Sequence, residues 1–124
     1  ARSHDDQSIN KQVKHMKETF ETTANELGGQ AEVLVEKSYP GFEVNETDKV
    51  TQYAISSALA LGLKGDTCIA GGGSDGNIMN QYGIPSVILG VGYENIHTTS
   101  ERIAIKDMYM LTRQIIKIIE LVAE

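Results

Sequence analysis

Two stretches of this 124-residue sequence combine residue types that could carry out chemistry. The first is the glycine-rich run from Gly71 to Asn77, in which Gly71, Gly72 and Gly73 precede Ser74, Asp75 and Gly76. Glycines let a ligand approach the backbone closely, and N–H groups at the start of a following helix favour an anion. The run therefore predicts either a loop that contacts a ligand or an ordinary connection, and in both cases Ser74 or Asp75 would cap the following helix.

Familiar nucleotide and hydrolase motifs do not describe this run. No lysine follows it as in a Walker A loop, and three adjacent glycines do not fit G-x-G-x-x-G with a later acidic partner. Ser74 is not expected to be a nucleophile, because G-x-S-x-G is absent and no base can be assigned to it.

The second stretch is residues 91–101, where His97 follows a predicted strand. A loop imidazole can bind a metal or shuttle a proton, although a solvated surface histidine is the commoner case. Glu101 could share a metal with His97 or orient its imidazole. These two residues do not make a zinc site, which needs three or more protein ligands, and Asp75 is not expected to be the third.

Near the N-terminus, Arg2 could hold a carboxylate in a bidentate fork or could simply be exposed. His4 and His15 are expected to be solvated.

Composition excludes several classes of function. The net charge is −6 and the eleven basic residues are dispersed, which argues against nucleic-acid binding. Cys68 is the only cysteine, so no internal disulfide can form, as is usual for a protein of the reducing cytoplasm. No apolar run reaches the roughly 20 residues needed to span a bilayer, and no signal peptide is present. We therefore expect a cytoplasmic protein with neither nucleic acid nor membrane as a partner.

The elements that must position these residues can be predicted from periodicity and caps. Helices are expected from Gln7 to Leu27, from Thr47 or Asp48 to Leu63, from Asn77 to Tyr82, and from Lys106 to Val122. Strands are expected at residues 30–38, which alternate, and at 67–70 and 86–91, which are continuously apolar. Asp5 and Asp6 are candidate caps of the first helix, and Gly28-Gly29 its stop.

This order of elements predicts an α/β fold in two parts. After Phe42, helices alternate with apolar strands, which is typical of a parallel or mixed sheet covered by helices on both faces. Residues 1–43 form a separate unit, an amphipathic helix followed by an amphipathic strand. This unit is half of a split β-α-β layer and would bury its helix poorly without more strands.

Four motifs occur together in order: Gly72-Gly73-Ser74-Asp75-Gly76-Asn77, Gly83-Ile84-Pro85, Gly90-Val91-Gly92 and His97-Thr98-Thr99-Ser100-Glu101. This ordered set resembles the C-terminal end of the peptidase T / carboxypeptidase G / aminoacylase family of zinc metallopeptidases, and most closely its peptidase T-like group. The resemblance spans essentially the whole chain. It implies that residues 1–43 are the second half of a ferredoxin-like lid or dimerisation domain. It also implies that residues 44–124 are the C-terminal part of the catalytic α/β domain.

The resemblance also implies a function. Such enzymes hydrolyse short peptides with two zinc ions that activate water. By position, His97 matches the last metal ligand of the family, and Arg2 matches an arginine that grips the terminal carboxylate of the peptide. The residues that match the lining of the substrate cleft are Gly72, Gly73, Ser74, Asp75 and Asn77. At Gly71 the sequence departs from peptidase T, which has an arginine there.

Most of the metal ligands of the family have no counterpart here. The H-x-D pair, the bridging aspartate, the Glu-Glu pair and a further acidic ligand are absent, as is the lid histidine that a dimer partner contributes. We therefore expect an inactive C-terminal portion of a homodimeric zinc aminopeptidase or tripeptidase, and the start without Met fits this expectation. The alternative is a small complete module that binds an anionic metabolite at the glycine loop and dimerises through its first helix.

Overall fold

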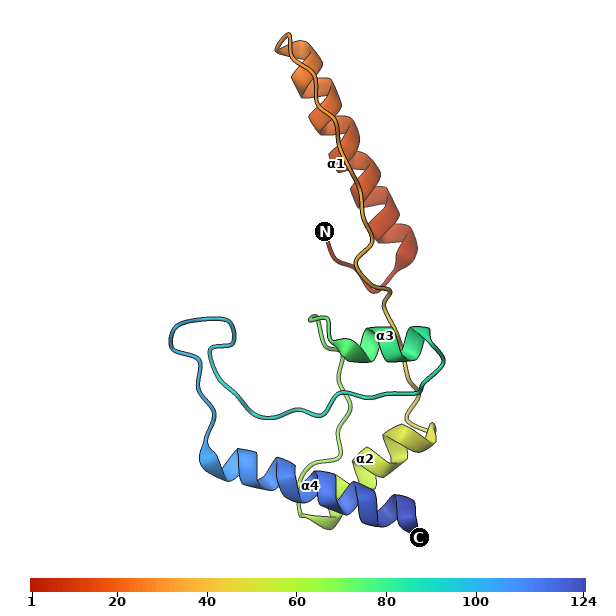
Figure 1. The fold of residues 1–124 in the computed structure, drawn as a ribbon, viewed down its shortest axis with the longest axis vertical. Helices are drawn as coiled ribbons and strands as arrows, with labels where there is room; N and C mark the ends of the chain where they lie inside the picture. Colours follow the sequence, from red (N-terminus) through yellow and green to blue (C-terminus); the bar gives the residue numbers. More distant parts are fainter. The chain divides into compact units, whose positions relative to one another are not determined.

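The computed structural model describes every residue from Ala1 to Glu124 and contains four helices (Figure 1). These are α1 (Asp6–Glu26), α2 (Lys49–Ala60), α3 (Asp75–Gln81) and α4 (Ile105–Ala123). The chain divides into two compact units, Ala1–Glu43 and Val44–Glu124. No helix is long and apolar enough to cross a membrane.

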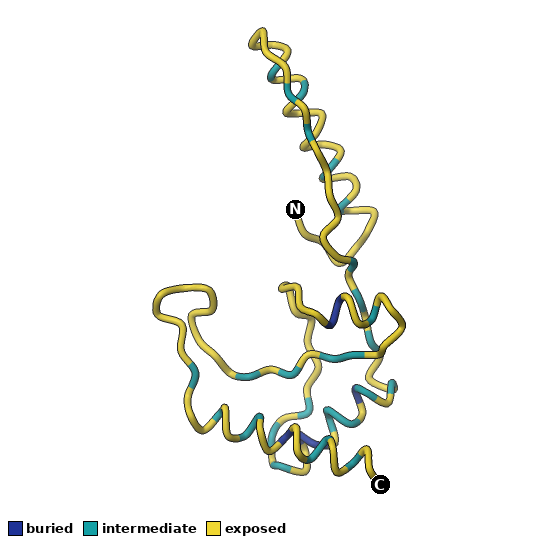
Figure 2. Tube along the Cα trace, in the orientation of Figure 1, coloured by how far each residue is buried: buried dark blue, intermediate teal, exposed yellow.

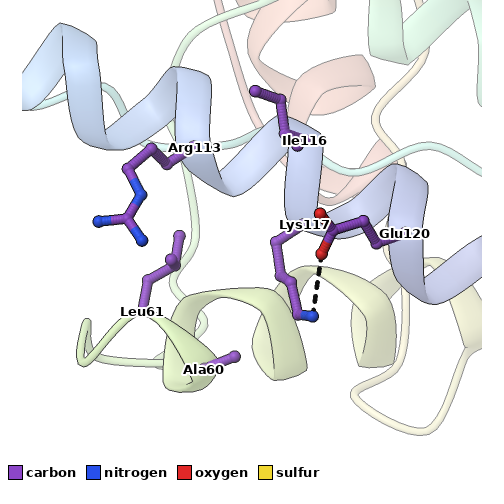
Figure 3. A pocket seen from close by; sticks show the side chains of 6 residues that line it. All are labelled: Ala60, Leu61, Arg113, Ile116, Lys117 and Glu120. Atoms are coloured by element: carbon purple, nitrogen blue, oxygen red, sulfur yellow. Dashed lines mark hydrogen bonds and ion pairs between the residues drawn. The ribbon is translucent and has the colours of Figure 1, made fainter.

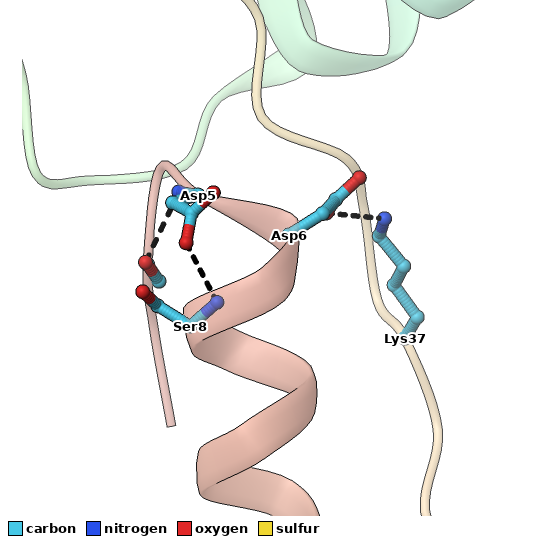
Figure 4. A network of polar contacts seen from close by, with 5 residues as sticks. Asp5, Asp6, Ser8 and Lys37 are labelled. Carbon is cyan, nitrogen blue, oxygen red and sulfur yellow. Dashed lines mark hydrogen bonds and ion pairs between the residues drawn. The ribbon is translucent and has the colours of Figure 1, made fainter.

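The first unit is built on α1, whose two ends follow the sequence signals. At its start, Asp5 accepts a hydrogen bond of 2.7 Å from the Ser8 main-chain N–H (Figure 4). At its end, Gly28 has a φ of +75° and Gly29 donates to the Ala24 carbonyl at 2.8 Å. This is the Schellman pattern, in which a left-handed glycine satisfies the last carbonyls of the helix.

The apolar side of α1 is only partly covered. The residues after the helix run back along it (Figure 1), with Ala31 and Val33 half-buried. Phe20 is nevertheless 58% exposed and Leu27 82% exposed, and no residue of α1 is buried. An exposed ion pair of 3.1 Å between Lys37 and Asp6 (Figure 4) adds little stability. The expectation that this unit buries its helix poorly is confirmed.

The second unit depends on the packing of α2 against α4, the only two helices in contact. The Ala54 carbonyl accepts hydrogen bonds from Ser57 Oγ at 2.8 Å and from Gln114 Nε2 at 3.2 Å. Ser57 is fully buried, and Ala58 is the one buried hydrophobic residue of the chain (Figure 2). Small side chains thus let the two helices approach closely around a shared carbonyl.

The predicted helices are confirmed with shifts of a few residues at their ends. α2 ends at Ala60, three residues before the predicted end at Leu63, and α3 begins two residues early, at Asp75. Asp48 does not cap α2 through its side chain; its Oδ2 accepts the Asn45 N–H at 2.8 Å instead. The predicted ends differ because the local hydrogen bonds, rather than the apolar stripe, decide where each helix stops.

The predicted sheet is not confirmed in this chain. Residues 30–38, 67–70 and 86–91 form neither helix nor ladder, and the single β contact is an isolated antiparallel bridge between Glu94 and Arg102. A strand is held by hydrogen bonds to a neighbouring strand, and none of these segments pairs with another. Cys68, within the second of them, is exposed.

Two properties of the helices can be tested, the first at the start of α1. Hydrogen bonds from the Ser8 hydroxyl and then from the Ser8 main-chain N–H lower the pKa of Asp5. A carboxyl whose pKa is lower in the folded chain stabilises the fold above its unfolded value, near pH 4, and loses this effect as pH falls through the folded value. We expect the Ser8 amide proton shift in NMR spectra to titrate with a midpoint below the ordinary Asp pKa. Asp5→Asn, which keeps the cap, should abolish that titration, and an unchanged titration would contradict the cap.

The second property is the close approach at Gly65. A Cβ atom there would lie 2.9 Å from Ile55 Cγ2 and 3.3 Å from Leu59 Cγ. Gly65→Ala should therefore lower the free energy of unfolding by about 1–3 kcal/mol, the usual cost of overpacking. Gly90→Ala is the matched control, because nothing lies within 4 Å of its added Cβ. Urea denaturation followed by circular dichroism measures both, and equal effects would contradict the packing of Gly65.

Candidate functional site

The glycine-rich run leads into α3 through a capping box. The Ser74 N–H donates to Asn77 Oδ1 at 2.9 Å, and the Gly76 N–H donates to Ser74 Oγ at 3.2 Å. Ser74 is thus the N-cap, one of the two residues that the sequence favoured for this role. The box satisfies N–H groups at the start of α3 from within the loop, so they are not left for an anion.

Asn80 fixes the other end of α3, a role that the sequence did not reveal. Its Nδ2 donates to the Gly76 carbonyl at 2.8 Å and to the Ser86 carbonyl at 2.9 Å, and its Oδ1 accepts the Ser86 N–H at 3.1 Å. One amide side chain therefore joins α3 to the segment beyond Pro85. The only signal for it was an asparagine three residues before a glycine, which is too common to single out.

The predicted substrate-binding residues differ in exposure. Gly72, Gly73, Ser74 and Asp75 are exposed, whereas Asn77 is buried and its Oδ1 holds the Ser74 N–H. Arg2 is exposed and belongs to the other unit, Ala1–Glu43. Any contribution of Arg2 to the same site stays a prediction.

His97 lies in a closed loop of residues 94–102. The Glu94 N–H donates to the Arg102 carbonyl at 2.8 Å, the Arg102 N–H donates to the Glu94 carbonyl at 3.2 Å, and the two side chains form an ion pair. Inside the loop, Asn95 and His97 have φ values of +54° and +64°, a conformation uncommon for residues other than glycine. The tip of the loop is exposed, and the His97 imidazole is open to solvent.

Glu101 contacts His97 through the main chain. Its Oε2 accepts the His97 N–H at 2.6 Å. The sequence had suggested that Glu101 could share a metal or orient the imidazole. The structure shows one oxygen of the carboxylate bound to the main-chain N–H of His97.

The two loops lie on the side of the second unit away from α2 and α4 (Figure 1). No group of three or more His, Cys, Asp or Glu side chains is assembled that could hold a metal ion. A zinc ion needs at least three protein ligands, and His97 can supply one. The donor set of this chain therefore does not fit a complete zinc site.

A hollow between α2 and α4 is a second place where charged side chains gather, namely Arg113, Lys117 and Glu120 (Figure 3). Its charged side chains already have partners: Lys117 Nζ lies 3.0 Å from Glu120 Oε2, and the Arg113 guanidinium lies 6.0 Å from the Tyr109 ring centroid. The hydrogen bond with Glu120 raises the pKa of Lys117. Within the hollow, Lys117 and Glu120 therefore pair with each other, whereas Arg113 keeps its positive charge beside the Tyr109 ring.

Comparison with known proteins agrees with the motifs. The chain is 60% identical to a tripeptidase from Staphylococcus aureus subsp. aureus Mu50, with a TM-score of 0.89 over 98% of this chain and 33% of that structure. It is 42% identical to the aminopeptidase PepT from Bacillus cereus ATCC 10987, with a TM-score of 0.78 over 97% of this chain and 32% of that one. It is also 40% identical to the uncharacterized protein YqjE of Bacillus subtilis (strain 168), over 97% of this chain and 32% of YqjE.

The chain thus spans about a third of the length of each of these relatives. The sequence pattern of peptidase family M20/M25/M40 matches residues 5–121, which is nearly all of the chain. The resemblance to peptidase T-like enzymes is confirmed, and this chain belongs to peptidase family M20/M25/M40.

Proposed function

We propose that the whole protein is a dinuclear zinc exopeptidase of the aminopeptidase or tripeptidase type, which hydrolyses short peptides, and that this chain is its C-terminal portion. The observation that carries the proposal is the 60% identity to a tripeptidase, maintained over 98% of the chain at a TM-score of 0.89. The family is generally metal-dependent, and the matched segment includes His97 and the glycine-rich run.

In this proposal the chain contributes one metal ligand and part of the substrate cleft. His97 is the ligand, since its imidazole is exposed at the tip of a loop closed by local hydrogen bonds. Residues 72–77 line the cleft, held by the capping box at the start of α3. Arg2 binds the terminal carboxylate of the peptide. Zinc, when bound, would lower the pKa of water and polarise the peptide carbonyl.

The proposal implies that this chain alone is inactive, because its His, Cys, Asp and Glu side chains do not assemble a metal site. The unpaired segments 30–38, 67–70 and 86–91 would join strands from the rest of the protein. Ala1–Glu43 would complete a lid domain and contribute to a homodimer, which would cover exposed apolar residues such as Phe20 and Leu27. The alternative of an anion-binding module gains no support from the capping box, which already uses the Ser74 and Gly76 N–H groups.

The role of His97 can be tested in the full-length protein. We expect His97→Ala to lower kcat/KM for tripeptides by more than the roughly 10- to 100-fold that loss of an outer-shell partner costs, because a direct ligand is removed. Zinc content after dialysis at neutral pH should fall in parallel. His15→Ala is the matched control, because His15 is an exposed histidine of α1 and should leave both measurements unchanged.

The same assays test the inactivity of the chain alone. Purified residues 1–124 should bind zinc weakly, without tight stoichiometric binding, and should not cleave a tripeptide when zinc or cobalt is added. Cleavage by the isolated chain would contradict the proposal that the remaining ligands lie elsewhere in the protein. Full activity of the His97→Ala enzyme would contradict the role of His97.

A further inference from the structure

We propose that Glu101 is the positioning residue of His97: its carboxylate holds the His97 main chain in a left-handed conformation and thereby sets the direction of the imidazole. This inference rests on the proposed role of His97 as a ligand. It assigns to Glu101 a task different from sharing the metal or touching the imidazole.

The contact itself is short and local. The distance from the His97 N atom to Glu101 Oε2 is 2.6 Å, within the range of strong bonds from an N–H to an ionised carboxylate. No other hydrogen bond holds the main chain of His97. The φ of +64° places this residue in a region that sterics disfavour for a side chain with a Cβ. A specific contact is therefore needed to hold this conformation, and Glu101 supplies it.

The rest of the loop presents Glu101 to His97. Thr98 donates to the Asn95 carbonyl from its N–H at 3.2 Å and from its Oγ1 at 2.7 Å. The Glu101 N–H then donates to the Thr98 carbonyl at 3.2 Å. These turns fold the loop so that the Glu101 carboxylate reaches the His97 N–H, while the bridge between Glu94 and Arg102 closes the base of the loop.

The main-chain conformation of His97 matters because it sets the direction in which the side chain points. The direction of the Cα–Cβ bond follows from φ and ψ, so a change at His97 from the left-handed region would aim the imidazole elsewhere. A site tolerates displacements of only about 0.5 Å or 10–20° in its ligands. A carboxylate that fixes a ligand from outside the coordination shell typically contributes about 10- to 100-fold in metal affinity.

The test uses the full-length protein with three substitutions. Glu101→Ala removes the acceptor, and Glu101→Gln removes the charge but keeps an amide oxygen that can accept the same N–H. Glu94→Gln is the matched control, because it removes one negative charge from the same loop and breaks the ion pair with Arg102 without touching the His97 N–H. The readouts are hydrogen exchange of the His97 amide in zinc-free protein, zinc affinity by chelator competition, and kcat and KM separately.

We expect Glu101→Ala to speed exchange at His97 and to weaken zinc binding by about 10- to 100-fold. We also expect kcat to fall more than KM rises. Glu101→Gln should restore most of the exchange protection and zinc affinity, a rescue that general damage to the loop would not show. Glu94→Gln should remain near the wild type in every readout.

Three results would overturn the inference: unchanged exchange and zinc affinity in Glu101→Ala, no recovery in Glu101→Gln, or equal losses in Glu94→Gln. Failure of the proposed function would look different. In that case the wild-type protein would bind no zinc and cleave no peptide, whereas exchange at His97 in zinc-free protein would still report whether Glu101 holds the main chain.

Discussion

The close contact between α2 and α4 is the constraint on which the second unit depends. It forms around the Ala54 carbonyl, which accepts hydrogen bonds from Ser57 and Gln114, and around the buried methyl group of Ala58. Residues 61–104 form the long connection between the end of α2 and the start of α4. Both candidate site loops lie within this connection, so the packed helix pair fixes the two ends of the segment that contains them.

Within this connection, side-chain hydrogen bonds hold the backbone in place of the ladder that a sheet would provide. The Ser74–Asn77 box starts α3, and Asn80 ties its other end to Ser86. Glu101 fixes the next loop at His97. Each contact spans six residues or fewer, so each can form without the rest of the protein. Local polar contacts thus keep the two loops ordered where the backbone has no ladder partner.

The difference between local and distant information explains what the sequence could predict. Helix α1 was predictable because its apolar spacing, the Asp5 cap and the Gly28-Gly29 stop all lie within one segment. Residues 86–91, predicted to be a continuously apolar strand, keep Val87, Leu89 and Val91 half-buried. They form no strand, because a strand also needs a neighbour that no local pattern supplies.

At the candidate site, too, the local features could be predicted from the sequence and the others could not. The Ser74 cap follows from local chemistry, so the sequence indicated it. The task of Glu101 could not be foreseen, because nothing in the sequence indicates that a histidine adopts a positive φ. A shared site for His97 and the glycine-rich run could not be predicted from the residues, because the motifs give only their order along the chain.

Helix α4 links the apolar surface of the chain to the placement of His97. It meets α2 through the buried Gln114, with Leu111 and Ile118 half-buried beside it, while Ile105 remains 85% exposed and Ile119 lies outside the contact. A surface helix has one apolar face, whereas a helix that is apolar on several sides is typical of a protein interior. Ile105 begins α4 only three residues after Arg102 closes the His97 loop. Burial of this end of α4 by further polypeptide would therefore also anchor the loop, so that the packing of the second unit and the position of the proposed ligand would be set together.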